Sequence, residues 1–145
     1  MTSPYLFVYG TLKSDACNPN ANNLHQNAQL LGSAKWQGAL YLVRNYPGAV
    51  RSTNGSEHVL GEIWKLNDPE TLLISLDEYE ECAPRSPKPH EYIRSLEPVH
   101  FGVEIVNAWV YIYNLDIDNL KKIESGKFIN ENQILIRREN EDIRR

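Results

Sequence analysis

An apolar stretch near the start of the sequence ends abruptly at a glycine. Residues 6–12 read Leu-Phe-Val-Tyr-Gly-Thr-Leu, a strand-like run followed by the small and polar residues of a turn. Glycine adopts backbone angles closed to other residues and lets a ligand approach the main chain, so the amides of Gly10, Thr11 and Leu12 could converge on an oxygen atom. The same pattern also occurs in ordinary tight turns. The loop is therefore a candidate binding element that needs a second chemical group to support it.

Glu80 supplies such a group at the end of a predicted helix. Asp68 followed by Pro69 is a typical helix start, and the helix is expected to reach residue 79 or 80. Glu80 lies four residues after Leu76, so it continues the apolar stripe of this helix. Burial, the negative end of the helix dipole and Asp77 one turn away would all raise the pKa of the carboxyl group. Such a group can take and return a proton near neutral pH.

Simpler interpretations exist for these side chains. Helix geometry alone favours a Glu80 that faces solvent at the end of its helix, and Asp77 could serve as a capping or salt-bridge residue. Strand alternation places Tyr92 and Arg94 on one face, opposite Ile93. These two side chains either frame a pocket or form a pair on the surface.

Composition excludes several classes of function. The chain has 145 residues, 41% hydrophobic and 23% charged, as in an ordinary globular protein, and no apolar run is long enough to cross a membrane. A net charge of −4 without a concentrated basic face argues against nucleic-acid binding. The first residues lack the pattern of a secretory signal, so we expect a cytoplasmic protein.

Cysteine and histidine spacing gives no sign of a metal site. Cys17 and Cys82 are far apart in polar, turn-rich segments, which favours reduced thiols over a disulfide. The histidines show no short metal-ligand spacing; they are His25, His58, His90 and His100. We therefore expect no bound metal.

The periodicity predicts more strands than helices. Besides the first strand and the helix after Asp68, we expect a short helix over residues 22–31, with surface loops over 14–23 and 82–89. A turn is expected at 45–48, and another either near 101–102 or within 104–107. The expected strands cover residues 34–43, 59–66, 92–106 and 108–113. Residues 115–145 hold one short helical candidate and an apolar run at 134–136.

This element order indicates an α+β fold with a mixed, strongly curved, barrel-like β-sheet and flanking helices. Gly61 within a predicted strand would permit another backbone to approach closely. We expect one domain over residues 1–145, with the part beyond about 115 the least defined. The three tryptophans, on predicted strands, are expected in the core rather than at an interface. We expect a monomer or weak dimer, although the sequence leaves the oligomeric state open.

Eight short motifs occur in the order found in the gamma-glutamylcyclotransferase-like family, the AIG2-like group, which this chain resembles over residues 5–113. They are Tyr9-Gly10-Thr11-Leu12, Gly32-Ser33-Ala34, Gly38-Ala39-Leu40-Tyr41, Tyr46-Pro47-Gly48-Ala49-Val50, Gly61-Glu62-Ile63-Trp64, Leu76-Asp77-x-Tyr79-Glu80, Tyr92-x-Arg94 and Ala108-Trp109-Val110-Tyr111-Ile112-Tyr113. Eight motifs in this order are far more specific for the family than any one motif alone.

The resemblance implies a barrel-like sheet with a cavity at one end and a cofactor-independent reaction on a small γ-glutamyl substrate. The α-amine of that substrate attacks its own γ-carbonyl, which releases an amine and closes 5-oxoproline. In this family the loop amides hold the γ-glutamyl group and the glutamate, here Glu80, transfers the protons. Tyr9, Tyr92 and Arg94 are weaker candidates for substrate contact.

Other functions fit the same residues. A non-catalytic module could use the cavity to bind a small carboxylate such as 5-oxoproline, because fold does not determine activity. An interaction protein in which Glu80 is a surface acid is a third interpretation. Residues 81–89 vary widely among relatives, so the identity of the leaving amine is open.

Overall fold

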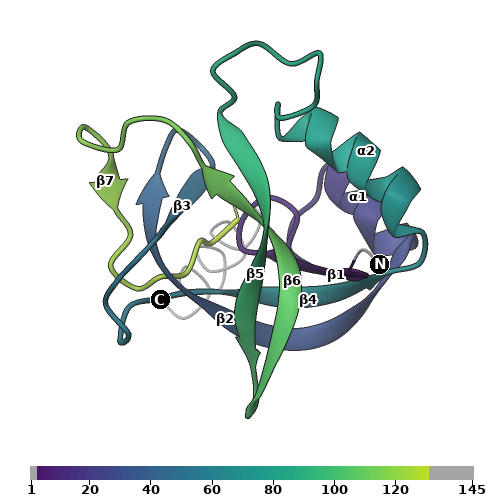
Figure 1. Ribbon diagram of the computed structural model, residues 1–145, viewed down its shortest axis with the longest axis horizontal. Helices are drawn as coiled ribbons and strands as arrows, with labels where there is room; N and C mark the ends of the chain where they lie inside the picture. Colours follow the sequence, from purple (N-terminus) through teal and green to yellow (C-terminus); the bar gives the residue numbers. More distant parts are fainter. Residues whose placement is uncertain (1–2, 131–145) are drawn as a thin grey trace, which may run out of the picture.

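Five strands close into a barrel in the computed structural model, which describes residues 3–130 (Figure 1). Hydrogen bonding follows the order β2-β4-β1-β6-β5, and a pairing of Lys35 with His100 joins β5 back to β2. Only the pairing of β1 with β6 is parallel among these. The strands are β1 (Tyr5–Val8), β2 (Ala28–Leu42), β4 (His58–Leu66), β5 (Tyr92–Phe101) and β6 (Glu104–Tyr113). The mixed, barrel-like α+β fold expected from the sequence is confirmed.

The long strand β2 extends beyond the barrel and carries two further strands. β3 (Pro47–Arg51) and β7 (Lys121–Lys122) both pair antiparallel with its last residues. The segment after β7 continues this packing through two backbone hydrogen bonds. Ile123 N–H donates to Leu40 O in β2, and Leu60 N–H in β4 donates to Gly126 O. The chain after β6 therefore returns across β2 and β4.

Two helices lie side by side against one side of the barrel (Figure 1). They are α1 (Pro19–Gln26) and α2 (Pro69–Tyr79). Each begins with a proline after a capping residue, Asn18 or Asp68, whose side chain accepts a hydrogen bond from the N–H group three residues later. Neither helix in the described part of the chain is long and apolar enough to span a membrane.

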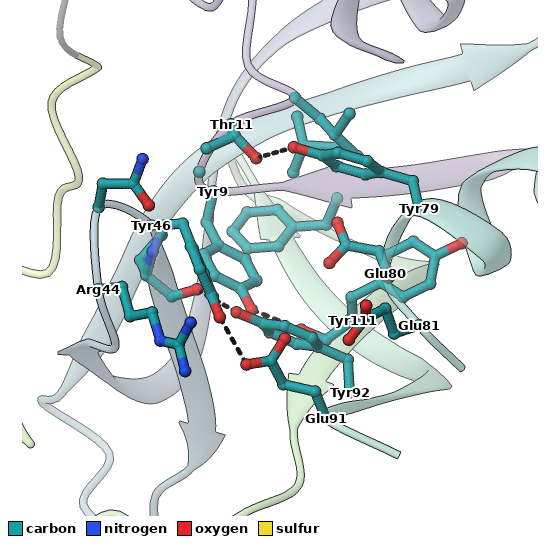
Figure 2. A pocket seen from close by; sticks show the side chains of 16 residues that line it. Tyr9, Thr11, Arg44, Tyr46, Tyr79, Glu80, Glu81, Glu91, Tyr92 and Tyr111 are labelled. Carbon is teal, nitrogen blue, oxygen red and sulfur yellow. Dashed lines mark hydrogen bonds between the residues drawn. The ribbon is translucent and has the colours of Figure 1, made fainter. Parts of the chain in front are cut away.

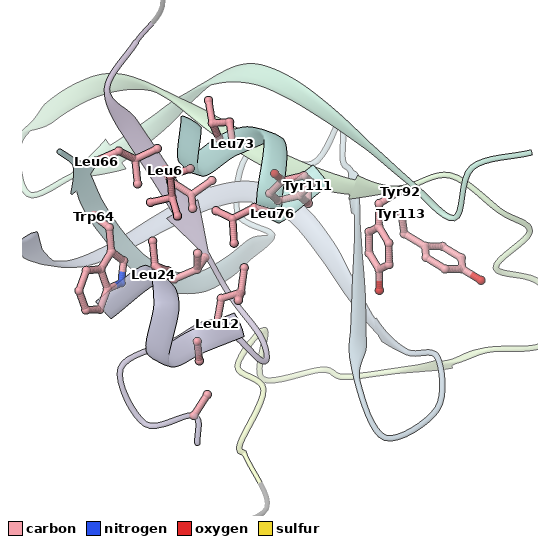
Figure 3. Close-up of a cluster of buried hydrophobic side chains, with 14 residues drawn as sticks. Leu6, Leu12, Leu24, Trp64, Leu66, Leu73, Leu76, Tyr92, Tyr111 and Tyr113 are labelled. Atoms are coloured by element: carbon pink, nitrogen blue, oxygen red, sulfur yellow. The ribbon is translucent and has the colours of Figure 1, made fainter. Parts of the chain in front are cut away.

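Alternation along β1 divides the core into two clusters. Leu6 and Val8 pack under the two helices, in the cluster that contains Leu24 and Leu76 (Figure 3). Phe7 and Tyr9 point to the opposite face and join the cluster inside the barrel. One strand therefore anchors both halves of the core before the chain enters the loop at residue 10.

Several expected elements are confirmed. The helix after Asp68 ends at Tyr79, and the β5–β6 turn falls at Gly102, the first of the two alternatives. A Cβ at Gly61 would collide with the carbonyl oxygen of Val8, which explains the glycine as a point of close backbone approach. Trp36 and Trp64 are buried and Trp109 is partly buried.

Other boundaries were wrong. The helix expected over 22–31 occupies Pro19–Gln26, and β2 begins at Ala28, because Asn18 and Pro19 already supply the cap and first helical position. The turn expected at 45–48 includes the start of β3, where Pro47 can open an edge strand since its missing N–H lies at the strand end. No helix follows Tyr113 within the described residues, and the apolar run at 134–136 lies outside them.

The contact at Gly61 gives a test of the barrel packing. Gly61→Ala is expected to lower the free energy of unfolding by about 1–3 kcal/mol, because the added methyl group would press on Val8 O and the Phe7 ring. Gly55→Ala is the matched control, since a Cβ there meets no atom within 4 Å, and it should change stability by less than about 0.5 kcal/mol. Urea unfolding of both variants measures the difference, and equal midpoints would contradict the tight packing.

Candidate active site

A cavity of about 440 Å³ lies where the end of β1, the end of α2 and the start of β5 meet. The loop between β2 and β3 forms another wall (Figure 2). Five tyrosines and four charged side chains are among the lining residues: Tyr9, Tyr46, Tyr79, Tyr92, Tyr111, Arg44, Glu80, Glu81 and Glu91. The rest of the lining includes the residues 10–12 of the loop.

The structure brings together six of the seven residues singled out from the sequence. Tyr9, Gly10, Thr11, Leu12, Glu80 and Tyr92 all line this cavity. Arg94 does not line it. Its guanidinium pairs with Asp77, with Nε 2.8 Å from Oδ1, and stacks 4.4 Å from the ring centre of Trp109. The expectation that Arg94 contacts substrate is therefore not supported, because its guanidinium already forms an ion pair with Asp77 of α2.

The loop after β1 has unused amide groups. Among residues 3–130, the N–H groups of Gly10, Thr11 and Leu12 donate to no protein acceptor, while Lys13 N–H donates to Gly10 O at 3.2 Å and closes a turn. Gly10 is required by packing, since a Cβ there would lie 2.7 Å from Pro47 Cγ. The loop thus combines a fixed turn with free hydrogen-bond donors at the cavity wall, an arrangement suited to an anionic oxygen.

Glu80 caps the C-terminal end of α2, and its side chain points from there into the cavity (Figure 2). Burial, followed by the negative charges of Glu91 and Asp77, raises the pKa of its carboxyl group to about 8. No hydrogen bond to this carboxylate occurs within the described part of the chain. The sequence predicted the raised pKa and the contribution of Asp77, but it missed Glu91 because that residue belongs to a segment distant along the chain.

Tyrosine hydroxyls fix the cavity walls through hydrogen bonds to backbone and acid groups. Tyr9 donates to Tyr111 O at 2.6 Å, and Tyr92 donates to Pro47 O at 2.6 Å. Tyr111 donates to Asp77 Oδ1 at 2.7 Å. Burial raises the pKa of all three hydroxyls well above the ordinary value, so they stay protonated near neutral pH. The role of Tyr111 was missed from the sequence, although its strand motif was recognised.

One hydrogen bond links the loop directly to the helix that carries Glu80. Thr11 Oγ1 and the hydroxyl of Tyr79 lie 2.7 Å apart (Figure 2). Tyr79 immediately precedes Glu80, so the position of the loop and the position of the acid are coupled. Within residues 3–130 no group of three His, Cys, Asp or Glu side chains is placed to hold a metal ion.

Solved structures share this architecture. A crystal structure of an AIG2-like protein from Mus musculus has a TM-score of 0.66 with 24% identity, over 90% of this chain and 91% of that one. A protein from Pyrococcus horikoshii, PH0828, has a TM-score of 0.61 with 20% identity, over 97% and 98%. At these identities the likeness concerns the fold alone.

The sequence comparison goes further than the fold. The model of the family described as gamma-glutamyl cyclotransferase, AIG2-like, matches residues 6–130, and the chain belongs to this family. The gamma-glutamylcyclotransferase family protein YtfP of Escherichia coli K12 is 35% identical over 129 residues, which are 88% of this chain and 98% of that protein. The solution structure of E. coli ytfP has a TM-score of 0.60 at 33% identity, with coverage of 88% and 98%. The resemblance seen in the motifs is thus confirmed.

The environment of Glu80 predicts a pH-dependent effect on stability. An unfolded chain ionises this carboxyl near its ordinary pKa of about 4.3, whereas the folded protein holds the proton up to a pKa of about 8. Between these values the folded state binds more protons, so the contribution of Glu80 to stability falls as pH rises. Glu80→Gln should therefore raise the melting temperature relative to wild type at pH 9 and have little effect at pH 4.

Thermal unfolding from pH 4 to pH 9 measures this difference. Glu78→Gln, at an exposed position of the same helix, is the control and should show no such trend. A Glu80→Gln difference that stays constant with pH would contradict the raised pKa.

Proposed function

We propose that this protein is a γ-glutamyl cyclotransferase that converts a γ-glutamyl amine or amino acid to 5-oxoproline and a free amine. The main support is the placement of Glu80, a carboxyl group with a pKa of about 8, in the same cavity as the amides of residues 10–12, which donate to no acceptor within residues 3–130. A proton-transfer group and an anion-binding loop are the two parts that this reaction requires.

The reaction is an intramolecular acyl transfer. The α-nitrogen of the substrate forms a bond to the γ-carbon, and the bond from that carbon to the leaving nitrogen breaks. One proton moves from the attacking nitrogen to the leaving nitrogen, so no other reactant is needed. Because both reacting groups belong to one molecule, the cavity needs only to hold the γ-glutamyl group folded, with its α-nitrogen close to the γ-carbon and favourably oriented.

Glu80 is proposed to carry that proton. Its ionised form accepts the proton as the amine attacks, and the resulting carboxylic acid returns it to the departing amine. A pKa of about 8 lets both forms be populated near neutral pH, as one group that acts first as base and then as acid requires. The absence of a hydrogen-bond partner for the carboxylate within residues 3–130 keeps its oxygen atoms available to substrate.

The loop amides and the tyrosines are proposed to hold the γ-glutamyl group. The N–H groups of Gly10, Thr11 and Leu12 would bind its carboxylate, and Tyr9 and Tyr92 would form the walls against its methylene groups. The cavity also carries Arg44, with Glu81 and Glu91, so it offers charges of both signs to the leaving amine. The nature of this amine is best determined with a substrate panel.

A substrate panel tests the proposal directly. We expect 5-oxoproline release from at least one of several γ-glutamyl amino acids, γ-glutamyl-ε-lysine or glutathione. Glu80→Gln keeps the shape but removes the base, and should lower turnover by at least about a hundredfold. Glu78→Gln changes an exposed acid of the same helix and should keep full activity.

The outcomes separate the competing functions. Turnover by Glu80→Gln at the wild-type rate would exclude the mechanism. A wild-type protein that binds 5-oxoproline, seen as a rise in melting temperature, but releases none from any donor would be a non-catalytic binding module. A surface role for Glu80 is already disfavoured, because this side chain lines the cavity and burial raises its pKa.

A further inference from the structure

Three carbonyl groups of the loop after β1, those of Gly10, Thr11 and Leu12, each have a side-chain partner from α1, its cap or residue 130. Gly10 O accepts from Asn130 Nδ2 at 3.1 Å, in addition to the turn hydrogen bond from Lys13 N–H. Thr11 O accepts from Asn18 Nδ2 at 2.8 Å. Leu12 O lies 3.0 Å from His25 Nε2. Three consecutive peptide groups are therefore held by their oxygen atoms.

Because peptide groups are planar, the hydrogen bonds to these carbonyl oxygens also set the direction of the N–H groups in the same peptides. In a planar trans peptide, the C=O of one residue and the N–H of the next point in opposite directions. Asn130 and Asn18, the side chains that hold Gly10 O and Thr11 O, are not among the residues that line the cavity. The N–H groups of Thr11 and Leu12 therefore point away from these two side chains. These are two of the amides that donate to no protein acceptor among residues 3–130, and both residues line the cavity.

The supporting side chains are themselves held firmly. Asn18 caps α1, because its Oδ1 accepts from Ala21 N–H at 2.8 Å while its Nδ2 reaches Thr11. The ring of His25, in the last turn of α1, stacks on Trp64 with 4.7 Å between ring centres. Asn130 is buried and also donates to Asp15 Oδ1 at 2.7 Å. α1 and residue 130 thus support the loop through side chains that have further contacts of their own.

We propose that Asn18, supported by Asn130, is a positioning residue that aims the N–H groups of Thr11 and Leu12 at a carboxylate in the cavity. This inference rests on the proposed function, in which that carboxylate belongs to the γ-glutamyl substrate. Asn18 does not touch the substrate. It acts through the Thr11–Leu12 peptide group, whose orientation depends on the hydrogen bond to Thr11 O.

Asn18→Asp separates the positioning role from the structural one. The aspartate retains Oδ1, so it still caps α1, and a negative charge at the start of a helix is favourable. It replaces the Nδ2 donor by an acceptor that repels Thr11 O. Gln37→Glu is the matched control: it also removes an amide donor to a backbone carbonyl, that of Ser52 at 2.8 Å, and lies outside the cavity lining.

Two measurements are made on the wild type and both variants. The first is the kinetics of 5-oxoproline release with the best donor of the panel. The second needs no turnover: glutarate is titrated while NMR follows the amide resonances of Thr11 and Leu12. For Asn18→Asp we expect KM and the glutarate Kd to rise about five- to tenfold with kcat nearly unchanged, the effect of losing about one hydrogen bond used in substrate binding.

The outcomes distinguish this inference from the proposed function. If the wild type releases no 5-oxoproline, but glutarate shifts its loop amides and binds more weakly to Asn18→Asp, the enzymatic proposal fails and the positioning role stands. If Asn18→Asp retains the wild-type KM and glutarate Kd, the positioning role is overturned whatever the activity. It is also overturned if glutarate leaves the Thr11 and Leu12 resonances of the wild type unmoved, or if Gln37→Glu weakens binding equally.

Discussion

The position of β1 in the barrel wall, between β4 and β6, is the constraint on which the remaining structure depends. This strand of four residues pairs antiparallel with β4 and parallel with β6, and its side chains enter both clusters of the core. Gly61 of β4 leaves room for the carbonyl of Val8, where a Cβ would collide with it, so the two backbones can pack closely. The loop that follows therefore leaves the barrel at a fixed point and in a fixed direction, beside the end of α2.

Asp77, Glu80 and Glu91 differ in how their charges are compensated. Asp77 forms an ion pair with Arg94 and accepts a hydrogen bond from the Tyr111 hydroxyl. Glu91 accepts a hydrogen bond of 2.6 Å from the Tyr46 hydroxyl. Glu80 lies between them without such a partner among the described residues. Burial and the negative charges of Glu91 and Asp77 both disfavour ionisation of Glu80, so the pKa of this carboxyl group is raised.

Local signals in the sequence were sufficient for the parts of the site that lie within one element. The cap at Asp68 predicted the helix, the spacing from Leu76 placed Glu80 on its apolar stripe, and the glycine at residue 10 predicted the loop. Alternation also grouped Arg94 with Tyr92, but one face of β5 covers both the cavity and α2, so the two side chains meet different surroundings. The start of β3 was hidden because a proline and a glycine are typical of turns as well as of edge strands.

Long-range contacts were beyond such reasoning, and the tie between Asn130 and Gly10 is the clearest example. These residues are 120 positions apart, so nothing in either local pattern indicates the other. Their hydrogen bond also connects two segments that are remote in the sequence at one place in the structure. Because Gly10 O accepts from Asn130 and Thr11 O accepts from Asn18, a change near residue 130 or near residue 18 reaches neighbouring peptide groups of the same loop. Alterations far from the cavity along the chain can therefore change the shape of its wall.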